Sequence, residues 1–168
     1  GVAALQEGEK GYEGFIRLGE GTPSMDAATP VEETGAWEHV TDLGLERAVA
    51  SFLGESLQVP PMYSALKKEG QRLYELARRG ETVERSPRKI HVSEFCATRA
   101  STPQDLCYRV RCSKGTYVRV LAHDLGRKLG TCAHVTALRR TRSGEYDVRD
   151  AWSLEALLRE LETMAMAR

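Results

Sequence analysis

The sequence predicts an α+β fold in which helices flank a mixed, mainly antiparallel sheet. Strand-like patterns, with apolar side chains set among polar or small ones, lie near residues 11–19, 88–98, 106–113 and 136–143. Amphipathic helical patterns lie near residues 42–53, 117–129 and 153–163. Because strands and helices do not alternate in the regular rhythm of a parallel sheet, antiparallel pairing is favoured.

The first elements are a strand, a loop and a short edge strand. Residues 11–19 place large apolar side chains among small and charged ones, as a strand does. Residues 22–26 have the composition of a loop, and residues 31–33 favour a short edge strand. Strand-like residues begin almost at the first position, and we interpret the chain as the continuation of a larger domain.

Two helices follow, each with recognisable end signals. Residues 42–53 fit an amphipathic helix that Thr41 or Asp42 caps and Gly54 ends. The Pro-Pro pair at residues 60–61 excludes a helix start before it, and Leu73, Leu76 and Ala77 then form a short helix that ends at Gly80.

The stretch from residue 106 to residue 130 is the most informative part of the chain. Residues 106–113 alternate cleanly and contain no proline, which predicts a strand inside the sheet. A Lys-Gly-Thr-Tyr turn then leads into a helix that stops at Gly130. Backbone amides, Lys114 and Arg119 converge there beside the Tyr117 ring, which suits a nucleotide. An ordinary strand-to-helix turn with Tyr and Arg at the surface is the alternative.

The last predicted elements are a strand and a helix. The strand at residues 136–143 has a mixed face because of its arginines, and Ser153 caps the final amphipathic helix.

Composition places the chain among globular proteins of a reducing, intracellular compartment, either the cytoplasm or an organelle. No apolar run approaches the length of a membrane span, and the first residues do not resemble a signal peptide. The four cysteines lack C-x-x-C spacing and are predicted to be reduced thiols. They are Cys96, Cys107, Cys112 and Cys132. The four histidines are scattered singly, so we expect no metal and no cofactor.

Basic residues are concentrated in two stretches, although the net charge is zero. Residues 1–66 carry three basic and eleven acidic side chains, residues 67–89 eight and four, and residues 109–142 nine and one. A neutral chain with one strongly basic half predicts a surface that faces a polyanion. Solvated helix faces and turns would give the same pattern.

Four motifs, in order along the chain, resemble one family. They are Lys10-Gly11-Tyr12 with Arg17-Leu18-Gly19, the Gln-Val-Pro-Pro-Met-Tyr-Ser-Ala-Leu-Lys run at residues 58–67 with Arg72-Leu73-Tyr74, the Cys-Ser-Lys-Gly-Thr-Tyr-Val-Arg run at 112–119, and the Ala-His-Val-Thr-Ala-Leu-Arg-Arg run at 133–140. Over most of its length the chain resembles the TruB-type tRNA pseudouridine synthases, which isomerise a uridine in the T-loop of tRNA.

The resemblance implies that a uridine is flipped out of the RNA into a pocket. Tyr12 corresponds to the tyrosine that stacks on the base, although a half-buried strand aromatic would look the same. Tyr117 and Arg119 correspond to catalytic pocket residues, and Arg119 is expected to pair with the family's catalytic aspartate. Leu138 corresponds to the apolar pocket wall, with a core leucine as the alternative. Asp26 lies in a loop that the family places near the pocket.

The resemblance also implies one synthase-like domain over residues 1–168, with a thumb-like RNA-binding insertion at residues 60–85. Eight basic side chains are candidate RNA contacts. They are Lys67, Lys68, Arg72, Arg78, Arg79, Lys114, Arg139 and Arg140. A solvated, charged helix is the alternative for the five in the insertion.

The nucleophile of the family has no counterpart in this sequence. It is the aspartate of a Gly-x-x-Asp-x-x-Ala-x-Gly motif that precedes the Tyr12 strand, and neither Asp26 nor Asp124 matches it. We therefore expect an incomplete catalytic domain that forms no pseudouridine alone. Arg119 is then expected to face solvent, an RNA phosphate or a neighbouring chain.

Two interpretations of function stay open. In one, the chain is the part of a pseudouridine synthase that binds RNA and shapes the uridine pocket. In the other, it is a non-catalytic RNA-binding subunit of a larger ribonucleoprotein, such as the ribosome or a splicing or assembly complex. The expected partners are RNA (the tRNA T-loop or ribosomal RNA) and either other ribonucleoprotein chains or a separate polypeptide that supplies the missing sheet. No membrane partner is expected.

Overall fold

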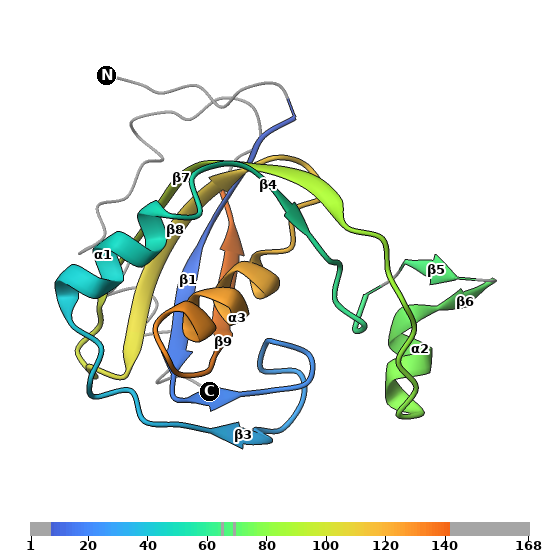
Figure 1. The fold of residues 1–168 in the computed structure, drawn as a ribbon, viewed down its shortest axis with the longest axis horizontal. Coiled ribbons are helices and arrows are strands. Elements are labelled where there is room, and N and C mark those ends of the chain that lie inside the picture. Colours follow the sequence, from blue (N-terminus) through green and yellow to red (C-terminus); the bar gives the residue numbers. More distant parts are fainter. Residues whose placement is uncertain (1–7, 65, 69, 142–168) are drawn as a thin grey trace.

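The computed structural model describes residues 8–64, 66–68 and 70–141. Five strands form one antiparallel sheet in the order β4-β7-β8-β1-β9 (Figure 1). They are β1 Lys10–Leu18, β4 Gly54–Gln58, β7 Arg88–Arg99, β8 Asp105–Cys112 and β9 Ala133–Arg140. The predicted α+β class with a mainly antiparallel sheet is confirmed. The predicted helix at 153–163, with its Ser153 cap, lies outside the described residues.

The strand β8 lies at the centre of the sheet, as its alternation predicted. Its four apolar side chains on one face are fully buried, and they pack with residues of β1 in the main core. They are Leu106, Tyr108, Val110 and Cys112. The neighbouring β9 begins at Ala133, earlier than predicted, and a β-bulge interrupts its pairing with β1 next to Phe15 and Ile16.

Two helices cover one face of the sheet (Figure 1). α1 Asp42–Ala50 packs on β7, and α3 Val118–Lys128 packs on β9 and β1. The Thr41 hydroxyl caps α1 by accepting the Gly44 N–H at 2.9 Å. α1 ends at Ala50, before the predicted stop at Gly54, because Gly54 is already the first residue of β4.

The end of α3 agrees with the prediction. Gly130 has a φ of 76°, and its amide donates to the carbonyl of Arg127 while the Thr131 amide donates to that of Gly126. This Schellman turn directs the chain straight into β9.

The lobe, residues 59–87, is inserted between β4 and β7, and it stands away from the sheet (Figure 1). It contains a hairpin of β5 Lys67–Lys68 and β6 Gln71–Arg72, followed by α2 Leu73–Arg78. The α2 helix ends in a Schellman turn at Gly80, as predicted, whereas the hairpin and β4 were not predicted. A second small ribbon pairs β2 Glu20–Gly21 with β3 Glu33–Thr34, close to the predicted edge strand.

Candidate functional site

A cavity of about 300 Å³ lies where the start of α3 meets β1, β9 and the loop after β2. It is lined by Tyr12, Asp26, Thr116, Tyr117, Val118, Arg119, Val135 and Leu138. All five residues that the sequence assigned to the uridine pocket are therefore brought together, from four separate segments of the chain. Its volume is at the lower end of the range for small-molecule sites, which suits a single base better than a whole nucleotide.

The turn between β8 and α3 positions the aromatic and cationic side chains of the cavity. The Ser113 Oγ accepts the His91 N–H at 2.9 Å and lies 2.9 Å from the Thr116 hydroxyl. Gly115 has a φ of 86°, a conformation that side chains strongly disfavour. The turn is held in this conformation, and α3 begins immediately after it, at Val118. Tyr117 and Arg119 therefore line the cavity.

Arg119 binds backbone from two distant segments. One terminal nitrogen donates to the Ser24 carbonyl at 2.8 Å and the other to the Tyr63 carbonyl at 2.8 Å. Its Nε lies 3.8 Å from Asp26 Oδ2, and the guanidinium lies 5.8 Å from the centre of the Tyr117 ring. The expectation that Arg119 faces solvent, RNA or another chain is therefore wrong, because Asp26 and the two carbonyls satisfy it internally.

The loop of Asp26 is held tightly against β9. Asp26 Oδ1 accepts the Ser24 hydroxyl at 2.6 Å and the Ala28 amide at 2.9 Å. Met25 has a φ of 65°, and its carbonyl accepts the Val135 amide at 3.0 Å. The second carboxylate oxygen of Asp26 is thereby presented to Arg119.

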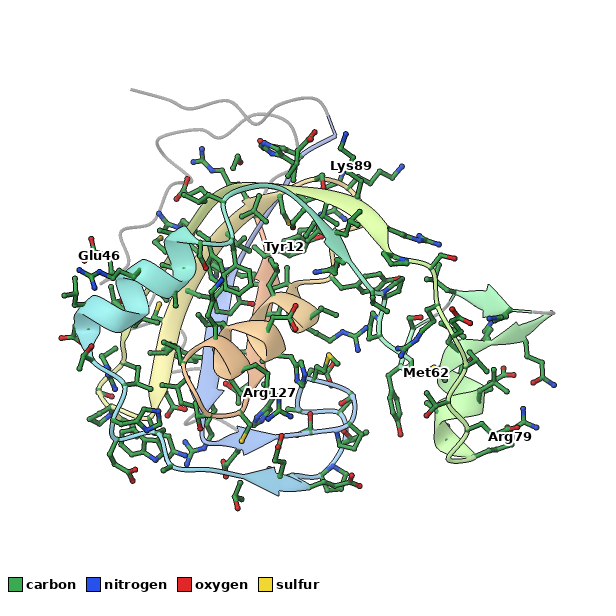
Figure 2. The ribbon with its side chains drawn as sticks, viewed as in Figure 1. Tyr12, Glu46, Met62, Arg79, Lys89 and Arg127 are labelled. Atoms are coloured by element: carbon green, nitrogen blue, oxygen red, sulfur yellow. The ribbon has the colours of Figure 1, made fainter. Side chains whose placement is uncertain are left out.

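Tyr12 and Leu138 supply the apolar walls. Tyr12 is half-buried on β1, and burial, with a smaller contribution from Cys112, raises the pKa of its phenol while Arg140 lowers it. Its ring is therefore neutral at physiological pH. Leu138 is 46% exposed, which differs from the core leucine that was the alternative. Figure 2 shows Tyr12 over the sheet and Met62 in the connection to the lobe.

Most of the candidate RNA contacts lie in the lobe or beside the cavity. Lys68 is exposed on β5, next to Lys67, and Arg72 precedes α2. Arg78 and Arg79 lie at the end of α2, where Arg78 stacks over Tyr74 and Arg79 pairs with Glu81 at 3.1 Å. Figure 2 places Arg79 at the far end of the lobe.

Near the cavity, Lys114 and Arg140 are exposed, whereas Arg139 is not placed for RNA. Because neighbouring strand residues point to opposite faces, Arg139 points away from the cavity that Leu138 lines. It binds Glu13, whose side chain is 4% exposed and also lies 3.7 Å from Arg109. This buried ion cluster argues against the phosphate contact predicted for Arg139.

Sequence reasoning missed Gln58 and Ser24. Gln58 binds the backbone of Tyr117 through both ends of its side-chain amide. Gln58 is the first residue of the run that contains Pro-Pro-Met-Tyr, and this position was the one available signal. A glutamine in a sequence does not by itself indicate a functional residue, because amide side chains are common on protein surfaces. Ser24 was assigned only to a loop.

The described residues contain no group of three potential metal ligands and no helix long and apolar enough to cross a membrane. The four cysteines are free thiols, and burial raises the pKa of Cys112 to about 11.

Residues 2–118 match the TruB family pseudouridylate synthase N-terminal domain, and residues 119–166 match the tRNA pseudouridylate synthase B C-terminal domain. The tRNA pseudouridine synthase B of Flavobacterium johnsoniae is 45% identical over 150 residues, which are 89% of this chain and 65% of that protein. The protein of the same name from Opitutus terrae is 48% identical over 149 residues, 89% of this chain and 61% of the relative. The chain thus spans less than two thirds of these relatives.

Solved structures share the fold. A Cbf5-Nop10-Gar1 complex contains a chain with a TM-score of 0.56 and 26% identity, matched over 90% of this chain and 35% of that one. An H/ACA RNP bound to a substrate RNA containing 2'-deoxyuridine contains a chain with a TM-score of 0.51 and 22% identity, matched over 95% of this chain and 36% of that one.

Proposed function

Because the chain belongs to the TruB family of pseudouridylate synthases, we propose that it binds tRNA and holds a flipped T-loop uridine in the cavity. The observation that carries the proposal is the convergence of Tyr12, Asp26, Tyr117, Arg119 and Leu138 on one cavity of base-sized volume. The similarity at 45% and 48% identity to tRNA pseudouridine synthases B supports tRNA over another RNA.

Four of the lining residues have assigned roles in this proposal. The neutral Tyr12 ring stacks on the base, and Leu138 covers the opposite side, which together offset the cost of unstacking. Arg119 is held in place before RNA arrives, so its positive charge is presented to the bound nucleotide without reorganisation. Asp26 orients Arg119 rather than attacking the sugar, since one of its oxygens already accepts two hydrogen bonds.

The lobe acts in the proposal as the thumb that contacts the RNA backbone. Its basic residues supply sequence-independent affinity, while the cavity supplies the preference for an extruded base. Lys114 and Arg140 are exposed beside the cavity and contact phosphates near the flipped nucleotide.

The proposal is tested by incubating the purified chain with a T-loop hairpin RNA. We expect saturable binding that exceeds binding to a hairpin of equal stem length with an unrelated loop. We expect no pseudouridine, because these 168 residues contain no nucleophile motif. Equal binding of both hairpins would contradict the proposed function. Turnover by the chain would show that a carboxylate within it attacks, and Asp26 and Asp124 would be mutated first.

A further inference from the structure

The side chain of Gln58 binds one residue of the cavity wall through two hydrogen bonds. Its Nε2 donates to the Tyr117 carbonyl at 3.1 Å, and its Oε1 accepts the Tyr117 amide at 2.8 Å. Gln58 is only 5% exposed, so water does not compete effectively for either bond. The side-chain amide thus pairs with Tyr117 in the way that a neighbouring strand would.

Tyr117 needs this partner because of its place in the chain. It is the residue before α3, its backbone is extended, and no side chain caps the helix there. Without Gln58, the Tyr117 amide would lose its hydrogen bond in a partly buried setting, which is costly, whereas the Tyr117 carbonyl would keep the bonds from the Val120 and Leu121 amides. The position of the Tyr117 ring, and of Arg119 two residues further, therefore depends on Gln58.

Gln58 is also the first residue of the segment from Gln58 to Tyr63, which is called here the neck of the lobe. It is the last residue of β4 and pairs with Arg88, the first residue of β7, so the lobe leaves and re-enters the sheet at this point. A few residues further, the Tyr63 carbonyl accepts a hydrogen bond from Arg119. The segment from Gln58 to Tyr63 thus binds the backbone of Tyr117 and the side chain of Arg119.

We propose that Gln58 is a positioning residue that couples the neck of the lobe to Tyr117 and thereby sets the geometry of the uridine cavity. The inference rests on the proposed function. It predicts that Gln58 contributes to recognition of the flipped base without contacting RNA phosphates.

The first test is amide hydrogen exchange by NMR on the RNA-free chain. Gln58→Leu should speed exchange of the Tyr117 amide by roughly tenfold, the effect of one lost hydrogen bond. Gln104→Leu is the matched control, because the Gln104 side chain also donates to a backbone carbonyl, that of Leu18, away from the cavity. Unchanged exchange at Tyr117 in Gln58→Leu would overturn the inference. Should Gln58→Leu not fold, the similarly shaped Gln58→Glu replaces the donor with a carboxylate oxygen opposite the Tyr117 carbonyl, and the chemical shift of that carbonyl then reports the lost hydrogen bond.

The second test measures binding of a T-loop hairpin and of the same hairpin with an abasic site at the target position. The unmodified chain should prefer the intact hairpin by roughly five- to 150-fold, the range for a base stacked on an aromatic ring. Both Gln58 variants should lose most of this preference while the salt dependence of binding stays unchanged, because no phosphate contact is removed. Gln104→Leu should keep both properties.

The outcomes separate the two proposals. Variants of Gln58 that keep the base preference would overturn the positioning role and leave the proposed function standing. An unmodified chain without base preference would contradict the proposed function, and the coupling to RNA recognition with it.

Discussion

Arg119 donates its terminal hydrogen bonds to the carbonyls of Ser24 and Tyr63, so one side chain joins the loop after β2 to the neck of the lobe. Gln58 behaves in the same way, because both ends of its side-chain amide bind the backbone of Tyr117. The place of Arg119 at the cavity was predictable from its motif. Its partners were not, because they lie 56 and 95 positions away in the sequence.

A glycine determines how Leu138 reaches the cavity. A Cβ on Gly14 would lie 1.8 Å from the Ala137 carbonyl oxygen, so the β9 bulge can pack on β1 only when residue 14 lacks a side chain. Gly14→Ala should lower the free energy of unfolding by roughly 2–4 kcal/mol through overpacking. Thermal or urea unfolding measures this change.

The control for that change is Gly44→Ala, in the first turn of α1. There an added Cβ meets only the Thr41 hydroxyl, at 3.0 Å, and alanine favours the helix. Its stability should change by less than about 1 kcal/mol. Equal stability of the two variants would show that the bulge does not pack on Gly14 as described.

At the scale of elements, α3 and the lobe divide the work of recognition. The α3 helix carries Tyr117 and Arg119 at its start, and its Gly126 lets it approach Ala133 of β9 closely. The lobe carries basic side chains on α2 and the hairpin before it. Because the segment from Gln58 to Tyr63 joins the lobe to Tyr117 and Arg119, while Arg78 and Arg79 lie at the end of α2, phosphate contacts and base recognition should be separable by mutation.

Replacement of Arg72, Arg78 and Arg79 together by alanine tests the lobe. Each lost phosphate contact flattens the plot of log affinity against log salt by roughly 0.7–0.9, so three contacts give about 2–3. The base preference measured with the abasic hairpin should remain. Arg47→Ala, which replaces an exposed arginine on α1 outside the lobe, is the control and should change neither quantity. Unchanged affinity and slope in the triple variant would remove the lobe from RNA binding.

At the scale of the whole molecule, the parts predicted well are those that local pattern determines. The strand β8 and the ends of α2 and α3 follow from alternation and from glycine stops. The strand β4 was missed because it is a short edge strand in which Leu57 is 71% exposed, so it shows no buried face. The bulge in β9 was missed because it depends on packing against Gly14, a partner remote in sequence.

The site was predictable for a different reason. Its residues were found by resemblance to a family, and the residues alone would have supported an ordinary turn equally well. Arg139 shows the limit of this approach, since its motif suggested RNA while its place on the strand directs it to Glu13 on the other face.

Site-specific photocrosslinking shows whether the cavity receives a flipped uridine, as the proposed function requires. A T-loop hairpin with 4-thiouridine at the target position is bound to the chain, irradiated and digested, and the crosslinked peptide is identified by mass spectrometry. If the cavity receives the uridine, we expect crosslinks to Tyr12, Tyr117 or their immediate neighbours, and none when 4-thiouridine is placed in the stem. Crosslinks confined to the lobe, with none at the cavity, would contradict it.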